Sequence, residues 1–430
     1  MSDGAATDAA DTQSGEDLSE DADIRAARGL LSAEAVWERS AALFGRIEAG
    51  ASDYFAFDAD ALGPIADRVA ALTKSRFPSL DVPLHSRWRH FEVEGVDRFK
   101  GLAGARGWSS PAEAARAMGD LAILSVLLDA GAGPTWRYTE PASGLQIGRS
   151  EGLAIASLAM FASGVFSAVP ADPLRADAGA LETVSDEDFT SAFQISADNP
   201  LSGASGRRAL LGACAGAVRE CPELFATEDD PRPGGLIDAL AAEAVDGALP
   251  ATVILERVLE GFGPIWPSRL SLAGLPLGDT WQHEAIGDGT VGSDLVPFHK
   301  LSTWLSLSLI EPLAVRGVTV SALDQLPGLA EYRNGGLFVD GGALTLRDPA
   351  VVSEPLDVAH PIIVEWRAAT VTLLGRIAPL VRARLGADEQ SLPLGAILEG
   401  GTWLAGRQMA KERRADGGPP IPILSDGTVF

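Results

Sequence analysis

The chain has 430 residues, of which 46% are hydrophobic and 22% charged, and its formal net charge is −25. These proportions are typical of a globular protein with a large core, and they exclude a disulfide scaffold, a collagen-like chain and a long disordered protein. The acidic charge argues against a surface that binds nucleic-acid phosphates and against a polybasic membrane contact. We therefore expect neither a nucleic acid nor a membrane as a partner.

The first 23 residues form an acidic segment with eight Asp and Glu residues and no Lys or Arg. Such a composition is typical of a disordered tail. The segment lacks the basic and apolar regions of a signal peptide, so we expect a cytoplasmic protein. The best candidate for a membrane span, Gly152 to Val169, falls short of the roughly 20 apolar residues that a span requires and is expected to be a buried helix.

Helical signals dominate residues 24–430, for which we predict a single large helical domain of the mainly α class. One helix is expected to open near Ser32 and another at Ser110-Pro111-Ala112-Glu113, which combines an N-cap, a proline at the first helical position and a capping-box Glu. The second helix is expected to stop at Gly131. Periodicity predicts further helices over 151–164, 205–220, 235–246, 251–261, 297–316, 358–385 and 394–414.

Strand signals are few. Leu337-Phe338-Val339 and Leu344-Thr345-Leu346, joined by Asp340-Gly341-Gly342, predict one small β-hairpin. The remaining stretches are expected to be long irregular connections, over 76–108, 132–150, 165–205 and 263–296. Loops of such length in a compact protein are usually functional.

The common motifs of cofactor and metal chemistry are missing. The sequence has no G-x-G-x-x-G, P-loop, H-E-x-x-H or C-x-x-C motif, and its five histidines form no i, i+4 pair. The G-x-S-x-G elbow of serine hydrolases is missing too. We therefore expect no cofactor and no metal site.

The densest polar stretch lies between Asp279 and Arg347. Asp279-Thr280-Trp281-Gln282-His283 precedes a Gly-rich loop, Pro297-Phe298-His299-Lys300 opens an apolar helix, and Glu331-Tyr332-Arg333-Asn334 precedes two glycines. A cation such as Lys300 in a first helical turn opposes the helix dipole, so it needs another reason to be there. The alternatives are a lysine that extends to solvent and a polar turn at residues 331–334.

Smaller polar groups occur elsewhere. Ser86-Arg87-Trp88-Arg89-His90-Phe91 interleaves bases and aromatic rings, which favours a local contact with an anion or a ring. Asp129 and Arg149-Ser150-Glu151 are expected to be further pocket residues. Glu365 and Arg367 cannot face each other at i, i+2, so each needs its own partner, and structural ion pairs are expected there and around Glu399.

Several of these blocks resemble the uracil catabolism protein 4 family, from about residue 24 to Phe430. The blocks are Ser86–Phe91, Leu127-Leu128-Asp129-Ala130-Gly131-Ala132-Gly133, Leu295–Leu301, Glu331–Leu337 and Glu399-Gly400-Gly401-Thr402-Trp403. The family implies a role in a pyrimidine pathway in which ribosylated uracil is ring-opened. The step it implies for this member is the splitting of a ribosylurea-type intermediate into urea and a ribose moiety.

A second resemblance points the same way. Queuosine salvage N-glycosylases carry an F-Y-K block on a helix and, about thirty residues later, an acid-Tyr-Arg block whose acid works with the lysine at the glycosidic bond. Phe298-His299-Lys300 and Glu331-Tyr332-Arg333 look similar, with 31 positions between Lys300 and Glu331. The departures are His299 for Tyr and Glu331 for Asp. This resemblance implies a DNA-glycosylase-like core of the helix-hairpin-helix type.

The site expected from these resemblances is that of an N-glycoside hydrolase. Breaking a ribosyl C–N bond needs a carboxylate to stabilise positive charge on the anomeric carbon and an acid to protonate the leaving nitrogen. We assign Glu331 as the carboxylate and Lys300 as its positioning cation, and we consider His283, Asp279 or His299 as the proton donor. The expected catalytic residues are Glu331, Lys300 and His283, and the expected substrate-binding residues are Asp279, Trp281, His299, Tyr332, Arg333, Asn334, Arg87 and Arg89.

Two alternatives stay open. An amidohydrolase that attacks the ureido carbonyl would also release nitrogen, although the sequence offers no metal set and no activated Ser or Cys for it. A non-catalytic protein that binds a pyrimidine-pathway intermediate is the other. The expected partner in each case is a small molecule, a ribosylated one for the hydrolase, and Arg333, or Arg87 and Arg89, would hold a 5-phosphate if the substrate carries one.

Overall fold

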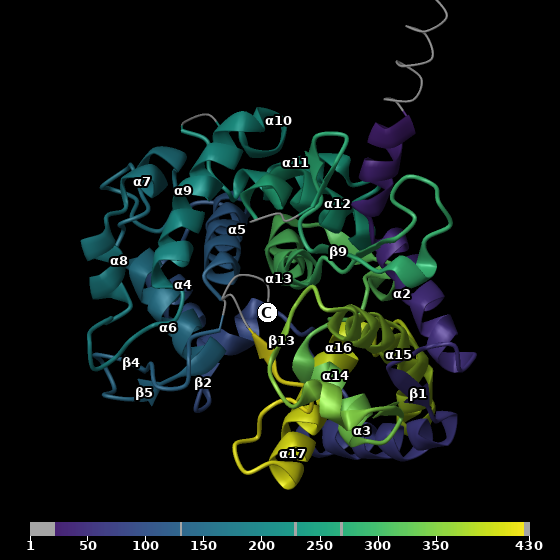
Figure 1. Cartoon of the computed structure of the whole chain (residues 1–430). Coiled ribbons are helices and arrows are strands. Elements are labelled where there is room, and N and C mark those ends of the chain that lie inside the picture. The colour runs from purple at the N-terminus through teal and green to yellow at the C-terminus, as the bar shows by residue number, and fades with distance from the viewer. Residues whose placement is uncertain (1–21, 130, 228–229, 267–269, 425–430) are drawn as a thin grey trace, which may run out of the picture.

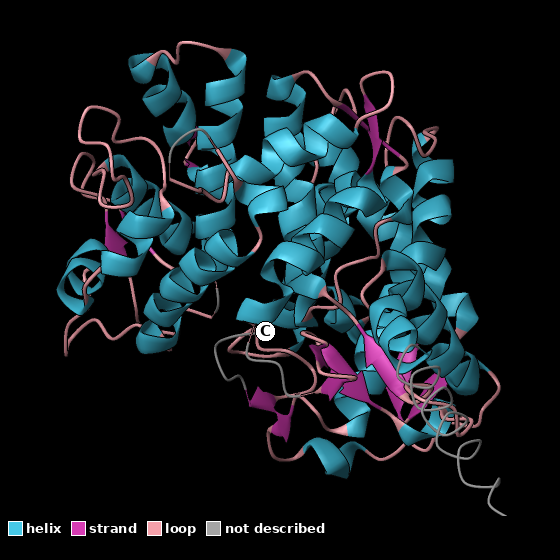
Figure 2. Ribbon diagram, turned by 90° about the horizontal axis from the view of Figure 1, so that it is seen from above, coloured by secondary structure: helices cyan, strands magenta, loops and turns pink. Residues whose placement is uncertain are grey.

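The computed structural model describes residues 22–129, 131–227, 230–266 and 270–424. The predicted acidic tail, residues 1–23, lies outside these ranges except for Ala22 and Asp23, which belong to a helix that runs to residue 30. Figure 2 shows that helices make up most of the described chain and that the strands are short and scattered. The mainly α class predicted from the sequence is therefore confirmed.

Local signals predicted two helix starts, one near Ser32 and one at Ser110-Pro111, and both occur there. Helix α2 (Ala33–Glu48) follows Ser32, whose side chain accepts a hydrogen bond from the Ala35 N–H. Helix α5 (Pro111–Leu127) follows Ser110 in the same way. The Glu113 carboxylate does not close the expected capping box, because it pairs with Arg116 and Arg232 instead. The α5 helix also ends four residues before Gly131.

The other predicted helices occur with small shifts in their ends. They are α6 (Arg149–Ala162), α9 (Ala204–Glu220), α11 (Gly235–Glu243), α12 (Ala251–Phe262), α13 (Lys300–Arg316) and α15 (Pro361–Leu385). The span predicted as one helix over 394–414 is instead α16 (Leu394–Ile397), a π-helical turn η7 (Leu398–Thr402) and α17 (Trp403–Arg413). None of the described helices has the length and apolarity needed to cross a bilayer.

Part of the chain expected to be irregular is helical: it holds α4 (Arg98–Arg106), α7 (Ala178–Thr183), α8 (Asp186–Ala192) and a 3₁₀ turn η2 (Arg87–Phe91). The other helices are α3 (Leu62–Arg76), which the apolar spacing of Leu62, Ile65, Val69 and Leu72 predicts, α10 (Pro222–Phe225) and α14 (Tyr332–Asp340). The helix α8 has a capping box between Ser185 and Asp188, a local signal that the sequence carries in a stretch predicted to be a loop.

The predicted hairpin at 337–346 is wrong. Leu337–Val339 lie inside α14, because the Glu331 side chain caps a helix there by accepting hydrogen bonds from the Arg333 and Asn334 N–H groups. The strand β12 (Leu344–Leu346) instead pairs antiparallel with β1 (Phe55–Phe57). The other two-stranded pairs are β2 (Glu92–Val93) with β3 (Val96–Asp97), β4 (Tyr138–Thr139) with β5 (Gln146–Ile147), β6 (Ala248–Pro250) with β11 (Thr319–Ser321), β7 (Ser271–Leu272) with β8 (Leu275–Pro276), β9 (Thr280–Gln282) with β10 (Leu295–Pro297), and β13 (Leu356–Asp357) with β14 (Ile423–Leu424).

Helix α13 occupies the middle of the molecule (Figure 1). It packs along α5, while α14 packs on α17 and the long α15 packs on α2 and α3. The hydroxyl groups of Thr303, Ser306 and Ser308 are buried and donate hydrogen bonds to carbonyl groups one turn earlier in the helix. Each of these three hydroxyl groups therefore has a hydrogen-bond partner in the core. One continuous hydrophobic cluster runs from Phe44 to Ile421.

Candidate functional site

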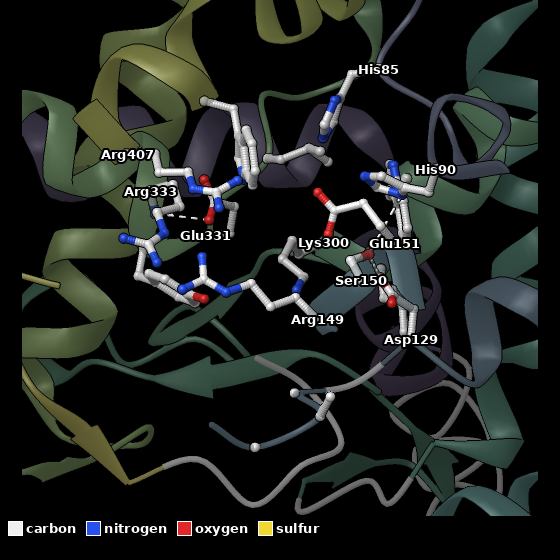
Figure 3. A pocket seen from close by; sticks show the side chains of 18 residues that line it. His85, His90, Asp129, Arg149, Ser150, Glu151, Lys300, Glu331, Arg333 and Arg407 are labelled. Carbon is white, nitrogen blue, oxygen red and sulfur yellow. Dashed lines mark hydrogen bonds between the residues drawn. The ribbon is translucent and has the colours of Figure 1, made fainter. Parts of the chain in front are cut away.

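A cavity of about 390 Å³ lies where the N-terminal ends of α6, α13 and α14 meet. The η2 segment, the turn after α5 and the helix α17 complete its wall. Figure 3 shows Arg149, Arg333 and Arg407 on one side, His85, His90 and Asp129 on the other, and Lys300 between them. The N-terminal end of a helix carries a partial positive charge, so three such ends make the cavity favourable for a negatively charged group.

Glu331 is the N-cap of α14 and lines the cavity. Its Oε2 atom accepts a hydrogen bond from the Arg333 N–H at 2.8 Å, and its Oε1 atom accepts one from the Asn334 N–H at 2.5 Å. Burial raises the pKa of this carboxyl group, while the two N–H groups and the nearby Lys300 ammonium act in the opposite direction. The backbone therefore holds the carboxylate in one orientation, with a proton affinity above the ordinary value for Glu.

Lys300 lines the same cavity from the first turn of α13. Burial lowers the pKa of its ammonium group, and the charge of Glu331 partly offsets that effect. The preceding residue, His299, has a left-handed backbone with φ of 45°, a conformation that costs free energy and is enriched at functional sites. Lys300 and Glu331, separated by 31 positions in sequence, thus come together at the junction of two helix N-termini.

Asp279 holds the start of α13 from behind the cavity. Its Oδ2 atom accepts a hydrogen bond from the Lys300 N–H at 3.0 Å. Arg367 donates two hydrogen bonds to the same carboxylate, at 2.7 and 2.8 Å. Burial alone would raise the pKa of Asp279, but its pairing with Arg367 holds that pKa below the ordinary value. Asp279 is therefore an ionised anchor for the backbone of Lys300.

A histidine–carboxylate pair forms the opposite wall. The Nδ1 atom of His85 lies 2.8 Å from Oε2 of Glu399, and Arg76 donates to Oε1 of the same carboxylate at 2.9 Å. Burial opposes ionisation of Glu399, but His85 and Arg76 together lower its pKa to about 2. The ionised carboxylate therefore holds the Nδ1–H of His85, which leaves Nε2 as the ring nitrogen available to the cavity.

The π-helical turn η7 directs Glu399 toward His85. Its two glycines make this turn possible, because a Cβ atom on Gly401 would lie 2.7 Å from the Val69 carbonyl oxygen and 2.8 Å from the Thr73 hydroxyl. Single π-helical turns are frequent at functional sites. The Glu-Gly-Gly-Thr-Trp block therefore supplies a carboxylate for His85 and, four residues later, the Trp403 ring that lines the cavity.

A second polar network surrounds Asp129. The Ser150 hydroxyl donates to Oδ2 of Asp129 at 2.6 Å, and the Nη1 atom of Arg87 lies 3.0 Å from Oδ1. Arg87 is fully buried and contacts the cavity wall through Asp129, through the Ser150 hydroxyl at 3.1 Å and through the Trp304 ring. Burial, followed by the charge of Arg87, lowers the pKa of the neighbouring His90 well below its ordinary value, so His90 is neutral near pH 7.

The structure divides the site residues predicted from the sequence into three groups. Glu331, Lys300, Tyr332 and Arg333 line the cavity. Arg87, Asn334 and Asp279 lie directly behind it, each bonded to a residue that lines it. The residues that lie elsewhere are Arg89, His283, Trp281 and His299.

Local partners explain the positions of this third group. Arg89 pairs with Glu311 at 2.8 Å, and the His299 ring bonds to the Leu30 carbonyl oxygen at 2.9 Å. Trp281 donates to Asp279 at 2.7 Å. His283 caps a short 3₁₀ turn through Nδ1, so it is not placed to protonate a ligand in this cavity. The catalytic and binding roles of all these residues stay predictions.

Sequence reasoning missed His85, His90, Trp304, Trp403 and Arg407 as site residues, although each lines the cavity. Of the residues expected as further pocket material, Asp129, Arg149, Ser150 and Glu151 do line it. Two signals were available: Trp403 and Arg407 follow the conspicuous Glu399-Gly400-Gly401 sequence, and His90 belongs to the block of bases and aromatic rings at Ser86–Phe91. Within the described ranges, no three His, Cys, Asp or Glu side chains gather in a group able to hold a metal ion.

Comparisons with known proteins cover nearly the whole chain. A family described as "Protein of unknown function (DUF1688)" matches residues 29–430. The chain is 36% identical over 415 residues to Uracil catabolism protein 4 of Lachancea kluyveri, which covers 89% of this chain and 93% of that protein. It is 37% identical over 413 residues to Protein urg3 of Schizosaccharomyces pombe, which covers 93% of this chain and 98% of that protein. The resemblance predicted from the polar blocks is confirmed, and the chain belongs to the DUF1688 family.

Proposed function

We propose that this protein acts in uracil catabolism as an N-glycoside hydrolase that splits a ribosylurea, or its 5-phosphate, into urea and a ribose moiety. The name of the Lachancea relative supports the pathway. The reaction is supported by one arrangement above all, the carboxylate of Glu331 facing Lys300 in a cavity whose other wall carries the His85–Glu399 pair. The DNA-glycosylase-like core that the second resemblance implies stays a prediction.

The proposed reaction breaks the bond between the anomeric carbon and the urea nitrogen. The electron pair of that bond leaves with the nitrogen, and positive charge develops on the anomeric carbon and the ring oxygen. The Glu331 carboxylate stabilises this charge and takes a proton from the attacking water, whose oxygen bonds to the anomeric carbon. Because burial raises the pKa of Glu331, the group is a better proton acceptor than an exposed Glu.

The leaving nitrogen needs a proton, because urea is a poor leaving group as an anion. We assign this proton to Nε2 of His85 in its protonated form, in place of His283, which lies outside the cavity. The proton that Glu331 takes from water then returns to His85 through solvent, so that one water is consumed for each urea and ribose released. Acid assistance of this kind contributes about 10²–10⁴-fold to the rate.

Urea release from N-ribosylurea, with and without a 5-phosphate, tests the proposal. Wild type and a control Glu412→Gln, whose side chain is exposed in a surface pair with Arg68, should release urea. Glu331→Gln should release at least about 10²-fold less, with a melting temperature showing that it still folds. Full activity in Glu331→Gln would contradict the assignment. Ammonia in place of urea would favour an amidohydrolase, and ligand-induced stabilisation without turnover would favour a binding protein.

A further inference from the structure

Three arginines gather at one end of the cavity, on the side away from His85 (Figure 3). Arg149 comes from the first turn of α6, Arg333 from the first turn of α14, and Arg407 from the middle of α17. The protein has 59 acidic and 34 basic residues, so an arginine here has ample acidic partners. Within the described part of the chain, however, none of these three guanidinium groups forms an ion pair with a carboxylate.

The fold holds Arg333 and Arg407 in place by contacts other than ion pairs. Arg333 donates to the Gly417 carbonyl oxygen at 2.7 Å, and its guanidinium lies 5.0 Å from the centre of the Tyr332 ring. The guanidinium of Arg407 lies 5.4 Å from the centre of the Trp403 ring. A Cβ atom on Gly406 would lie 2.0 Å from the Arg333 carbonyl oxygen, so only glycine there lets α17 approach α14 closely enough to bring Arg407 beside Arg333.

This arrangement is unfavourable without a ligand. Burial, and then repulsion by Arg149 and Arg333, lower the pKa of Arg407, and the negative charge of Glu151 offsets only part of this effect. Arg149 and Arg333 also lie in first helical turns, where a cation opposes the helix dipole. Arg149 in addition has a left-handed backbone with φ of 59°. A bound anion would offset the charge repulsion and the unfavourable helix dipoles, because it would accept hydrogen bonds from the guanidinium groups and face the positive helix ends.

We infer that Arg149, Arg333 and Arg407 form a subsite for a phosphate monoester, so that the substrate is the phosphorylated sugar derivative rather than the free riboside. The inference rests on the proposed function. Guanidinium groups match the planar oxygen pairs of a phosphate and form bidentate hydrogen bonds with it. With the phosphate held on this side, the anomeric end of the sugar extends toward Lys300 and the His85–Glu399 pair.

Ligand binding to the full chain tests the subsite without requiring turnover. The probes are ribose 5-phosphate, ribose and inorganic phosphate, measured by calorimetry on wild type, Arg407→Gln and Arg149→Gln. The matched control is Arg413→Gln, which removes the same charge from an exposed position on α17. Wild type and the control should bind ribose 5-phosphate at least about 100-fold more tightly than ribose, and each site variant should lose about tenfold to 100-fold of that preference.

The outcomes separate the subsite from the reaction. Equal affinity for ribose and ribose 5-phosphate, or a preference that survives in Arg407→Gln, would overturn the subsite even if urea were released from the free riboside. A phosphate preference that depends on Arg407 and Arg149 would support it even if no urea were released, an outcome that would contradict only the proposed reaction. If Arg149→Gln fails to fold because of its strained position, Arg407→Gln alone decides. Inorganic phosphate should compete with ribose 5-phosphate in wild type.

Discussion

The Nδ1 atom of His85 lies 2.8 Å from a carboxylate oxygen of Glu399, although 314 positions of sequence separate the two residues. Two features favour this contact: the π-helical turn that carries Glu399 and the hydrogen bond from the His85 N–H to the Gly395 carbonyl oxygen at 2.9 Å. Carboxylates that orient a histidine in this way select its tautomer and stabilise its protonated form during proton transfer. In the proposed reaction, this pair would supply the acid that a poor nitrogen leaving group requires.

If His85 is the acid, the loss of rate in a His85 variant should depend on the leaving group of the substrate. His85→Gln should lose about 10²–10⁴-fold of its rate of urea release. On a ribosyl pyridinium, whose leaving group departs as a neutral molecule, the loss should be less than about tenfold, because no proton is needed. Steady-state rates on both substrates check this prediction. A loss of equal size on both would show that His85 acts in binding or folding, and not as the acid.

Lys300 should control the pH at which Glu331 becomes active. The rate requires an ionised Glu331, so kcat/KM falls as the pH falls through the pKa of this group. The positive charge of Lys300 lowers that pKa, so its removal in Lys300→Met should move the acid limb of the pH profile to higher pH. Lys300→Arg should keep the limb in place, as should Lys74→Met, a change at an exposed position. An unmoved limb in Lys300→Met would contradict the proposed pairing.

The ion pair of Asp279 with Arg367 should be important for stability. Arg367 is almost fully buried, and Asp279→Asn would remove the ionised carboxylate that pairs with this guanidinium in the interior. Asp279→Asn is expected to lower the free energy of unfolding by about 3–5 kcal/mol. The control Glu243→Gln, which breaks a half-exposed pair with Arg257, should lower it by less than about 1 kcal/mol. Urea denaturation measures the free energy of unfolding of both variants. Similar losses in Asp279→Asn and Glu243→Gln would show that the buried pair is no more important for stability than the half-exposed one.

Glu365 predicts a stability that depends on pH. Burial raises its pKa from 4.5 to about 7, with Ser52 donating a hydrogen bond to it. A carboxyl group with a raised pKa contributes its full stability below pH 4.5 and loses that contribution as the pH rises through 7. Glu365→Gln keeps an acceptor for Ser52 and cannot ionise, so it should be more stable than wild type by about 2–3 kcal/mol at pH 8.5.

At pH 5 the free energies of unfolding of wild type and Glu365→Gln should differ by less than about 1 kcal/mol. At this pH Glu365 is protonated in the folded state and only partly ionised in the unfolded chain. Unfolding by urea at the two pH values measures both differences. A stability gain of the same size at pH 5 and pH 8.5 would show that ionisation of Glu365 is not its cause.

The sequence by itself determined the local structure and the family. The starts of α2 and α5 follow from Ser32 and Ser110, because an N-cap acts on N–H groups within three residues. Lys300 and Glu331 stood out because short polar blocks resemble known families, and the structure places both in one cavity. Neither result requires knowledge of a distant contact.

Tertiary structure decided the contacts between distant parts of the chain. Leu344 lies in a strand whose partner is Phe57, which no local pattern indicates. His85 gains Glu399 as a partner, and Arg407 lies with Arg149 and Arg333, only because α17 and its π-helical turn pack closely on α14 and α3. Charge pairing and cavity shape depend on distance in space, whereas periodicity and capping report only on neighbours in the chain. The His85–Glu399 pair, the cluster of three arginines and the cavity volume therefore depend on the folded structure.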